Sequence, residues 1–372
     1  MIYWVSFYTI MSFIILVFKK YNFVPWVIIC FILAFRYKFG TDYLVYTDEE
    51  YCNILNGLKP NYEILHTYLV YFTEYLGFNQ QFIFAIYAIL TTILFYKFCL
   101  YFSKNNTYTM FFTLLIFLLL FLKFIDQIRS CLAIAIFLYS TRFIIERKLL
   151  KYIFCCLLAY FSHKSAIILL PMYWILNIKY TKKTFYLLML LMIAIPFINT
   201  NYVIFLIDKI ISILNLAQYS MYFEWEINST FIGKIATIVY ILIFVIFYRI
   251  FNKEDKKEYF IINAMIIYLL IKSLQIHFGI LGRISAYFSA FNCVFIVFII
   301  MYAYKRIIQK DIFVAAIIVT LIAVSFYPVF LYYNEWSAAK HFAFNFSLFS
   351  KEDYVIQIFG DHNKAFGWIH DK

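Results

Sequence analysis

Charged residues are scarce in this chain. They make up 14% of the 372 residues, against 65% apolar residues. A soluble protein has about 25% charged residues and the polar surface that goes with them. The shortage excludes a soluble oxidoreductase, kinase or nucleic-acid binder and predicts an integral membrane protein. In such a protein the net charge of +12 has to be interpreted from its position relative to the bilayer.

Glycine and proline are also few, with 8 and 5 residues, whereas aromatic residues reach 23%. Long uninterrupted helices with aromatic belts fit that composition. Runs such as 111–122 lack the strict alternation of a membrane β-barrel. We therefore predict an all-α fold with a single integral membrane domain over 1–372. The first apolar run has neither a basic leader nor a small-residue cleavage motif, so it is interpreted as a span and not as a signal peptide.

Metal-ligand and repeat patterns are missing as well. The seven cysteines form no CxxC pair and none lies beside a histidine at ligand spacing, so neither a zinc site nor a disulfide framework is expected. The two halves of the chain share no spacing or motif, which weakens the case for a transporter built from duplicated bundles.

Apolar runs near the length needed to cross a bilayer, about 20 residues, recur along the chain. They predict about twelve spans, at 3–18, 23–37, 80–102, 108–125, 127–145, 149–162, 164–178, 184–199, 230–250, 258–275, 284–303 and 312–333. Basic clusters fall at every second boundary, at 19–20, 104, 147–151, 179–183, 253–257 and 305–310. By the positive-inside rule these six loops are cytoplasmic, and both termini, including a tail at 334–372, lie outside.

Two segments decide how many spans are counted and therefore on which side of the membrane the later loops lie. The stretch 63–77 is apolar on one side but short and charged, which favours an interfacial helix within an outer loop at 38–79. The stretch 149–178 is read either as one crossing or as a short hairpin that turns at 162–164. The hairpin is preferred, because a single crossing would put the basic clusters at its two ends on opposite sides.

Several polar side chains gather near the outer ends of the predicted spans. Each intramembrane charge costs about 2.5–3.5 kcal/mol on insertion scales, so a group at one depth suggests a shared polar cavity. The group contains Arg36, Gln127, Arg129, His163, His277 and Arg283.

A structural reading remains open for each of them. Arg36 either snorkels at an interface or pairs with Asp42 across a tight turn at Gly40. Arg129 either faces the bundle interior, next to small residues, or forms a salt bridge with Asp126.

His163 could merely cap a helix. Arg283 and Tyr287 are four residues apart and could form an ordinary cation–aromatic contact. His277 carries the weakest signal, and a structural role is favoured for it.

Three outward arginines around a histidine suit one kind of chemistry. Guanidinium groups bind phosphate oxygens with two prongs and stabilise a leaving pyrophosphate. A histidine titrates near neutrality and can take a proton from an attacking hydroxyl. Together these features point to glycosyl transfer from a polyprenyl-linked sugar.

At these residues the chain resembles the EpsG-like, Wzy-type polymerases of oligosaccharide repeat units in bacterial envelopes. The resemblance covers about 32–302. It is carried by Arg36, Gly40 to Tyr43, Tyr46, Glu63, Leu76-Gly77, Gln127 to Arg129, Phe161 to Ser165, Gln218-Tyr219, Tyr222, Arg283 and Tyr287-Phe288.

The resemblance implies a fold similar to that of membrane glycosyltransferases that use polyprenyl phosphate donors, and a metal-independent reaction without a cofactor. The donor would be a glycan on undecaprenyl pyrophosphate, and a second lipid-linked repeat unit would be the acceptor. Arg36, Arg129 and Arg283 would bind pyrophosphate, and His163 would be the base with Asp42 as the next candidate. Gln127, Tyr43 and Tyr287 would support them.

The resemblance also implies an outward-facing site in the bacterial inner membrane, with a flippase and a chain-length regulator as partners and no nucleic acid. Aromatic residues of the outer loop at 200–229 could stack on sugar rings, or that loop could be an interfacial helix. A flippase or exporter of lipid-linked sugars is the second reading of the sequence. A membrane acyltransferase acting on surface glycan is the third.

Overall fold

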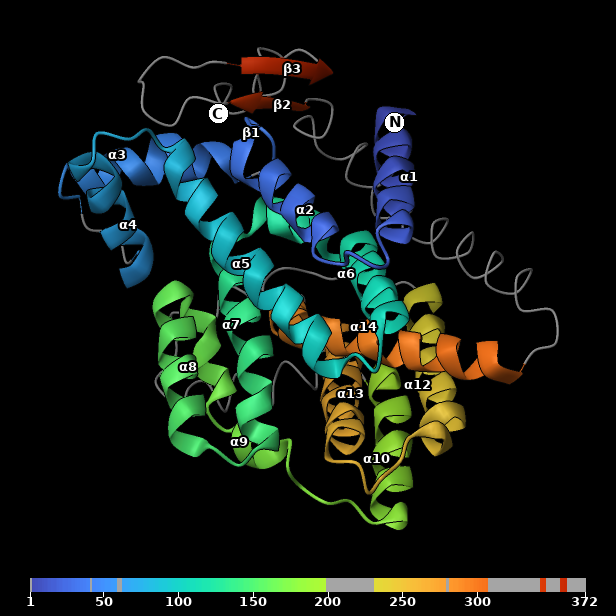
Figure 1. Cartoon of the computed structure of the whole chain (residues 1–372). Coiled ribbons are helices and arrows are strands. Elements are labelled where there is room, and N and C mark those ends of the chain that lie inside the picture. Colours follow the sequence, from blue (N-terminus) through green and yellow to red (C-terminus); the bar gives the residue numbers. More distant parts are fainter. Residues whose placement is uncertain are drawn as a thin grey trace. The chain divides into compact units, whose positions relative to one another are not determined.

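The computed structural model describes residues 2–40, 42–58, 62–198, 231–278, 281–306, 342–345 and 355–359 (Figure 1). These residues belong to two compact units. The first consists of Met1–Arg142, Leu150–Leu170 and Ala303–Lys372, and the second of Phe143–Leu149 and Pro171–Tyr302.

The first unit is a helical assembly around α6. Its helices are α1 (Ile2–Val17), α2 (Val24–Phe35), α3 (Glu50–Leu55), α4 (Ile64–Tyr75), α5 (Gln81–Phe102), α6 (Asn106–Asp126), most of α7 (Ile128–Ile145) and α8 (Leu149–Ser162), with a π-helical turn η1 (Val45–Glu49) and a 3-10 helix η2 (Lys164–Leu169). Helix α6 is buried along most of its length, and α2 packs along α5 (Figure 1).

Local sequence explains how these helices begin and how they pack. Asn105 caps α6 by accepting hydrogen bonds from the backbone N–H groups of Thr107 and Tyr108, at 3.0 and 3.2 Å. Pro25 lies in the first turn of α2, where its missing N–H has no partner to lose. Trp26 stacks on Phe95 of α5 and donates to Thr113 Oγ1 of α6 at 3.0 Å. A buried indole N–H is thereby satisfied inside an apolar interface.

The second unit contains α9 (Met172–Ile175), α10 (Lys182–Ala194), η3 (Ile195–Phe197), α12 (Phe231–Phe247), η5 (Tyr248–Ile250), α13 (Lys256–Gln275) and α14 (Leu281–Arg306). Aromatic stacking joins α10 to the end of α12, because Phe185 lies 3.9 Å from the Tyr248 ring, centroid to centroid. Asp255 caps α13 by accepting from the N–H groups of Lys257 and Glu258.

The predicted hairpin at 149–178 turns at the expected residues. Helix α8 ends at Ser162, η2 begins at Lys164, and the hydroxyl of Tyr152 donates back to the carbonyl of Leu169 at 2.5 Å. The returning half differs from the expected span at 164–178, since it consists of η2 and the four-residue α9. Pro171 at the N-cap of α9 lacks the N–H that a continuous helix would need there.

The structure is mostly helical, in agreement with the predicted all-α fold, and adds one small sheet. Strands β1 (Arg36–Tyr37), β2 (Phe342–Asn345) and β3 (Val355–Phe359) form an antiparallel sheet in the order β1-β2-β3, with Arg36 opposite Phe344. A two-residue strand has no alternation of its own, so its pairing with residues 300 positions away left no signal in the sequence.

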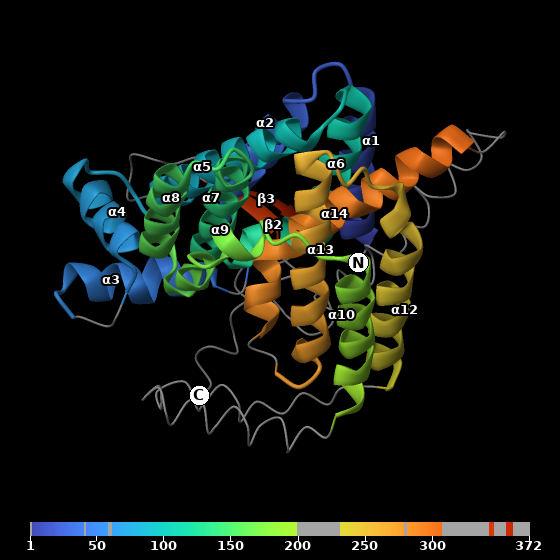
Figure 2. The same cartoon turned by 90° about the horizontal axis from the view of Figure 1, so that it is seen from below.

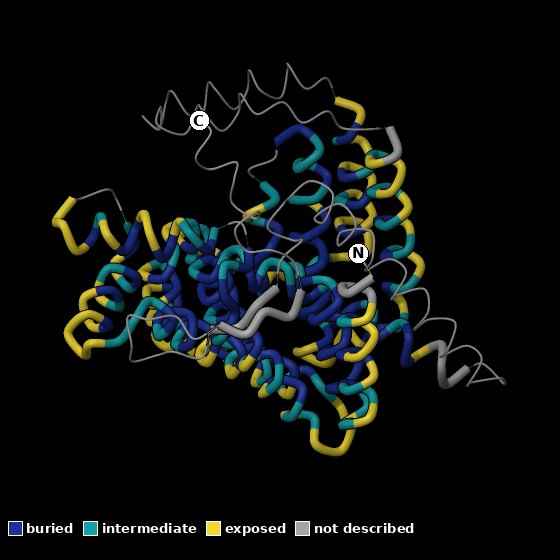
Figure 3. Tube along the Cα trace, turned by 90° about the horizontal axis from the view of Figure 1, so that it is seen from above, coloured by how far each residue is buried: buried dark blue, intermediate teal, exposed yellow. Residues whose placement is uncertain are grey.

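Within the part of the chain that the structure describes, six helices are long and apolar enough to cross a bilayer: 81–102, 106–126, 128–145, 233–250, 256–275 and 281–302. The fold is therefore mostly helical and polytopic, while the count of twelve spans stays a prediction. The span at 233–250 is only 17% buried, as expected where side chains meet lipid, and exposed residues run along the faces of several helices (Figure 3). The predicted span at 312–333, the loop at 200–229 and most of the tail at 334–372 lie outside the described residues.

Candidate active site

Two predicted site residues, Arg129 and His163, meet through the carboxylate of Glu63. Arg129 Nη1 lies 2.5 Å from Glu63 Oε2, and His163 Nδ1 lies 2.9 Å from Glu63 Oε1. The side chains of Arg129, Glu63 and His163 are 15%, 10% and 23% exposed. His163 is therefore the member that a substrate can reach most easily.

A second carboxylate–histidine pair lies on the other prong of the same guanidinium. Arg129 Nη2 is 2.9 Å from Glu50 Oε1, and Glu50 Oε2 is 3.3 Å from Nε2 of His66. His66 is fully buried, and its Nδ1 lies 3.5 Å from the hydroxyl of Tyr87. Arg129 thus bridges two carboxylate–histidine pairs, of which Glu63–His163 is partly exposed and Glu50–His66 is buried. We call these residues the Arg129 network: Glu50, Glu63, His66, Arg129 and His163.

Four separate elements bring the Arg129 network together. Glu50 opens α3 directly after the π-helical turn η1, a kind of turn that is frequent at functional sites. Glu63 precedes α4, and α3 and α4 lie together at one edge of the first unit (Figures 1 and 2). Arg129 lies in the first turn of α7, where Ser162 at the end of α8 donates to its carbonyl at 3.0 Å. That bond anchors the turn that carries His163.

An aromatic ring packs against the guanidinium of Arg129. The Tyr46 ring lies 5.0 Å from the Arg129 guanidinium carbon, within the range of a cation–π contact. Tyr46 belongs to a buried cluster with Tyr43, Tyr51, Phe84 and Tyr87. Burial raises the pKa of the Tyr46 phenol, although the charge of Arg129 opposes this shift, so Tyr46 stays uncharged at neutral pH.

The two carboxylates of the network titrate very differently. Burial raises the pKa of Glu50 to about 7, although Arg129 opposes the shift. Burial would also raise the pKa of Glu63, but the hydrogen bond from His163 and the charge of Arg129 outweigh it and lower that pKa to about 2. One guanidinium cannot fully compensate two buried carboxylates, so the proton goes to Glu50.

His66 stays neutral beside Glu50. Burial, reinforced by the charge of Arg129, lowers the pKa of His66 to about 3. Of the two groups, Glu50 therefore takes up a proton more readily than His66. With Glu50 protonated and Glu63 ionised, the charge of Arg129 is balanced.

Arg36 lies in β1 of the first unit and is 1% exposed. Its guanidinium donates to the carbonyl of Ile125 at the end of α6 and lies 4.7 Å from the Phe84 ring centroid. The turn at Gly40 explains this closeness, since Gly40 has φ +104° and a Cβ there would lie 2.8 Å from Ile125 Cγ2. The role of Arg36 in binding pyrophosphate stays a prediction.

Tyr43 is buried beside this turn. It stacks on Phe84 at 4.8 Å and donates to Gln81 Oε1 at 3.2 Å. Gln81 in turn donates to the carbonyl of Arg36 at 3.1 Å, which ties the start of α5 to β1. Asp42, the second candidate base, is half-buried between Gly40 and η1. Tyr43 is thus placed to stabilise the turn that carries Asp42.

The other predicted residues have distinct positions. Gln127 is half-buried at the junction of α6 and α7, two residues before Arg129. Arg283 and Tyr287 belong to the second unit, where Arg283 is exposed at the start of α14 and Tyr287 is fully buried. His277 Nε2 lies 2.9 Å from the carbonyl of Ile195, a contact that fits the structural role favoured for it.

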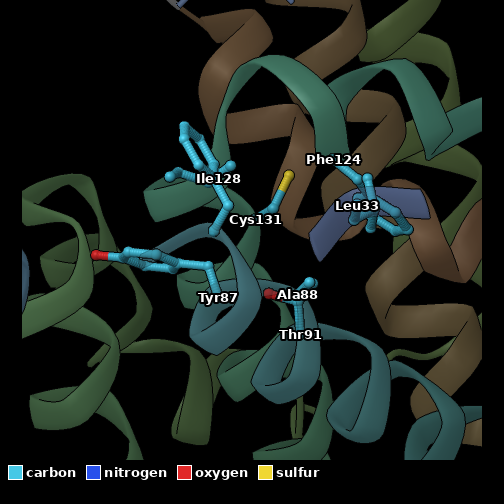
Figure 4. A pocket seen from close by; sticks show the side chains of 8 residues that line it. Leu33, Tyr87, Ala88, Thr91, Phe124, Ile128 and Cys131 are labelled. Atoms are coloured by element: carbon cyan, nitrogen blue, oxygen red, sulfur yellow. The ribbon is translucent and has the colours of Figure 1, made fainter. Parts of the chain in front are cut away.

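A small void lies near Tyr87, lined by Leu33, Phe84, Ala88, Thr91, Phe124, Ile128 and Cys131 (Figure 4). Its volume of about 10 Å³ is that of a single water molecule, so it holds no substrate. Among the described residues, no group of three or more His, Cys, Asp or Glu side chains is arranged to hold a metal ion. Independence from metal stays a prediction.

Sequence analysis missed the roles of Glu50, Glu63 and His66. Glu63 and His66 were assigned only to an amphipathic helix, although their spacing of three places them on one helical face. Glu50 is one of three consecutive acidic residues with Asp48 and Glu49, and nothing in the sequence singles it out. Only the packing of α3 against α4 selects it.

Comparison with known proteins matches residues 19–347 to the EpsG family. The match confirms the resemblance drawn from the sequence motifs and indicates a membrane protein with a polysaccharide polymerase type of function. No curated protein and no solved structure matches the chain.

Proposed function

The chain belongs to the EpsG family, and from that premise we propose that it joins lipid-linked oligosaccharide repeat units by glycosyl transfer. The donor is a glycan on undecaprenyl pyrophosphate, and the acceptor is a hydroxyl of a second lipid-linked unit. One observation carries the proposal: the hydrogen bond of 2.9 Å between His163 and Glu63.

His163 acts as the general base in this proposal. With Nδ1–H donated to Glu63, the ring nitrogen Nε2 is left as the acceptor, which is the tautomer that a base needs. The acceptor hydroxyl transfers its proton to Nε2 while its oxygen bonds to the anomeric carbon of the donor. The bond from that carbon to pyrophosphate breaks, and undecaprenyl pyrophosphate leaves with the electron pair.

Glu63 positions His163 and stabilises its protonated form. Because the pKa of Glu63 is about 2, its carboxylate stays ionised throughout the physiological range. A fixed negative charge beside Nδ1 favours the imidazolium that appears as the proton is transferred. The carboxylate oxygens of Glu63 contact His163 and Arg129, and in this proposal only His163 contacts the reacting atoms. Glu63 is therefore a positioning residue.

Arg129 binds pyrophosphate by exchanging one of its partners. The contact of Arg129 with Glu50, at 2.9 Å, is the weaker one, because burial raises the pKa of Glu50 to about 7, whereas the pKa of Glu63 is lowered and its carboxylate lies 2.5 Å away. A phosphate oxygen can replace Glu50, while the other prong keeps Glu63 in place. Arg36 and Arg283 are proposed as further pyrophosphate ligands, with Gln127, Tyr43 and Tyr287 supporting them and Asp42 as the alternative base.

We place this site on the outer face of the bacterial inner membrane, where lipid-linked units are polymerised into O-antigen, capsule or exopolysaccharide. A flippase would supply the units, and a chain-length regulator would act on the product. The six basic clusters, assigned to the cytoplasm by the positive-inside rule, support this orientation.

A deletion strain complemented with variants tests the function. Loss of a polymerase leaves a single repeat unit attached to its acceptor, so the deletion strain and the His163→Ala strain should both show that product on a glycan gel. Loss of a flippase removes even the single unit, and loss of an acyltransferase leaves polymer length unchanged. Either of those two profiles would contradict the proposal.

A further inference from the structure

The second unit contains a cavity of about 590 Å³ whose wall is strongly basic. Four cationic side chains line it, from Arg147, Lys179, Lys253 and Lys256, against the single carboxylate of Glu254. All four are exposed, and within the described residues none has a carboxylate within 4 Å. The cavity therefore attracts an external anion, and we call it the basic cavity.

Hydrogen bonds fix the backbone of this cavity. Asn263 of α13 donates to the carbonyls of Leu176 and Ile178, at 2.8 and 2.9 Å. Tyr259 of the same helix accepts from the N–H of Tyr180 at 2.7 Å. These bonds hold the segment with Lys179 against α13, so the cavity is preformed and not a gap between loose loops.

Arg147 occupies a position that normally favours glycine. Arg147 follows the end of α7 and has φ +61°. Its N–H donates to the carbonyl of Ile144, and the N–H of Lys148 donates to the carbonyl of Phe143. This is the Schellman arrangement, whose left-handed residue is usually glycine. Arginine costs about 1 kcal/mol there relative to glycine. The guanidinium of Arg147 is thus present at the cavity although arginine destabilises the backbone at this position.

The surroundings of the cavity indicate the kind of anion. Trp174 and Ile178, which precede Lys179 in the chain, are 58% and 45% exposed. An exposed tryptophan beside basic residues is typical of a membrane interface. Basic pockets between membrane helices on the cytoplasmic side bind phosphate-bearing lipid headgroups. The positive-inside rule assigns this face, with the clusters at 179–183 and 253–257, to the cytoplasm.

We propose that the basic cavity binds a phosphate-bearing anion supplied by the membrane, namely the headgroup of an anionic phospholipid. Lysines and Arg147 contact the phosphate oxygens, and Trp174 and Ile178 contact the start of the acyl chains. The inference does not depend on the polymerase reaction.

Titration of the purified full-length protein in detergent at about 0.15 M salt tests this proposal. The probes are short-chain phosphatidylglycerol, short-chain phosphatidylcholine and inorganic pyrophosphate, and the measurement is the dissociation constant of each. Phosphatidylglycerol should bind saturably and at least tenfold more tightly than phosphatidylcholine. Equal binding of the two lipids would overturn the proposal. Binding of pyrophosphate without phosphatidylglycerol would overturn the lipid source and assign the cavity to a soluble phosphate.

Variants locate the binding. The triple variant Lys179→Gln, Lys253→Gln, Lys256→Gln should weaken phosphatidylglycerol binding by about 100-fold, since each charge near a membrane surface is worth about fivefold. The control Lys182→Gln, Lys183→Gln removes two exposed charges of α10 that do not line the cavity and should change binding less than twofold. An equal loss of phosphatidylglycerol affinity in the control would show that the effect comes from general surface charge, and it would overturn the proposal.

Arg147→Gly separates binding from folding. Glycine suits the left-handed backbone, so this variant should fold with an unchanged or higher melting temperature and still bind phosphatidylglycerol about fivefold more weakly. A stable Arg147→Gly protein with wild-type affinity would remove the guanidinium from the site.

Discussion

Cationic side chains have different roles in the Arg129 network and in the basic cavity. In the network, two carboxylates surround one arginine at 2.5 and 2.9 Å, so its charge is compensated inside the protein. In the basic cavity, four exposed cationic side chains lie near Glu254, and among the described residues none of them has a carboxylate within 4 Å. A cation compensated from within holds other side chains in position, whereas uncompensated cations recruit an external anion. This difference predicts opposite responses to mutation.

The largest expected difference concerns accessibility. Single cysteines at Asn56 and Asn252, both exposed, report on the loops near the network and near the basic cavity. If the network faces outward and the cavity faces the cytoplasm, an impermeant thiol reagent applied to intact cells should label Asn56→Cys and spare Asn252→Cys. The reverse pattern would invert the topology, and labelling of both would place the two loops on one side.

The next largest effect is on the reaction rate. His163→Ala should reduce the extension of purified lipid-linked repeat units by about 100- to 10,000-fold, the usual contribution of a general base. Glu63→Gln keeps a hydrogen-bond acceptor but removes the charge, so its loss should be smaller, about 10- to 100-fold. A His163→Ala protein with a near-normal rate would transfer the role of base to Asp42.

A charge-preserving exchange should separate the two regions. Arg129→Lys retains one charge but cannot bridge Glu50 and Glu63 with two fixed prongs, so the extension rate should fall at least tenfold. The matched exchange in the basic cavity, Lys253→Arg, should leave the rate and the affinity for phosphatidylglycerol within about twofold. Wild-type polymer length with a stable Arg129→Lys protein would make Arg129 purely structural.

The smallest effect is a pH dependence of stability. Because the pKa of Glu50 is raised from 4.5 to about 7, its contribution to folding is complete below pH 4.5 and is lost as the pH rises through 7. The loss is at most about 3.5 kcal/mol, at about 1.4 kcal/mol per pKa unit. Glu63, with its lowered pKa, loses its own contribution only below pH 4.5 and does not interfere.

Melting temperatures of the detergent-purified protein between pH 5 and 8 measure this effect. Relative to Glu50→Gln, which carries no titrating group at this position, the wild-type protein should lose melting temperature across the range. The pKa of His66 is lowered from 6.5 to about 3, so His66 adds stability as the pH rises toward 6.5, and this opposing contribution is present in both proteins. Parallel curves would show that Glu50 is ionised throughout. In that case the exchange of the Glu50 prong for pyrophosphate loses its basis.

Sequence analysis predicted the helices more successfully than the site. Long apolar segments such as α5, α6 and α14 begin or end close to the expected residues, because bilayer length and burial both act on contiguous sequence. The turn at Ser162–Lys164 followed from the charges that flank it. The shortness of α9 and the strand at Arg36–Tyr37 did not, since they depend on packing against distant segments.

The site was predicted in part. Arg129 and His163 were singled out, because charged side chains in apolar segments are conspicuous by their cost, and the structure brings both to Glu63. Glu50, Glu63 and His66 lie in a polar loop and an amphipathic helix, where acidic and histidine side chains have no such cost. Their importance arises only from burial that the fold imposes.

Hydrophobicity and charge distribution act locally along the chain, so they were enough to predict a helical membrane protein that resembles the EpsG family. Tertiary structure decided which charges are compensated. It paired Arg129 with Glu50 and Glu63 across 79 and 66 residues, and among the described residues it left Arg147, Lys179 and Lys253 without a carboxylate within 4 Å. Electrostatic energy depends on distance and burial in space, and neither can be read from separation along the chain.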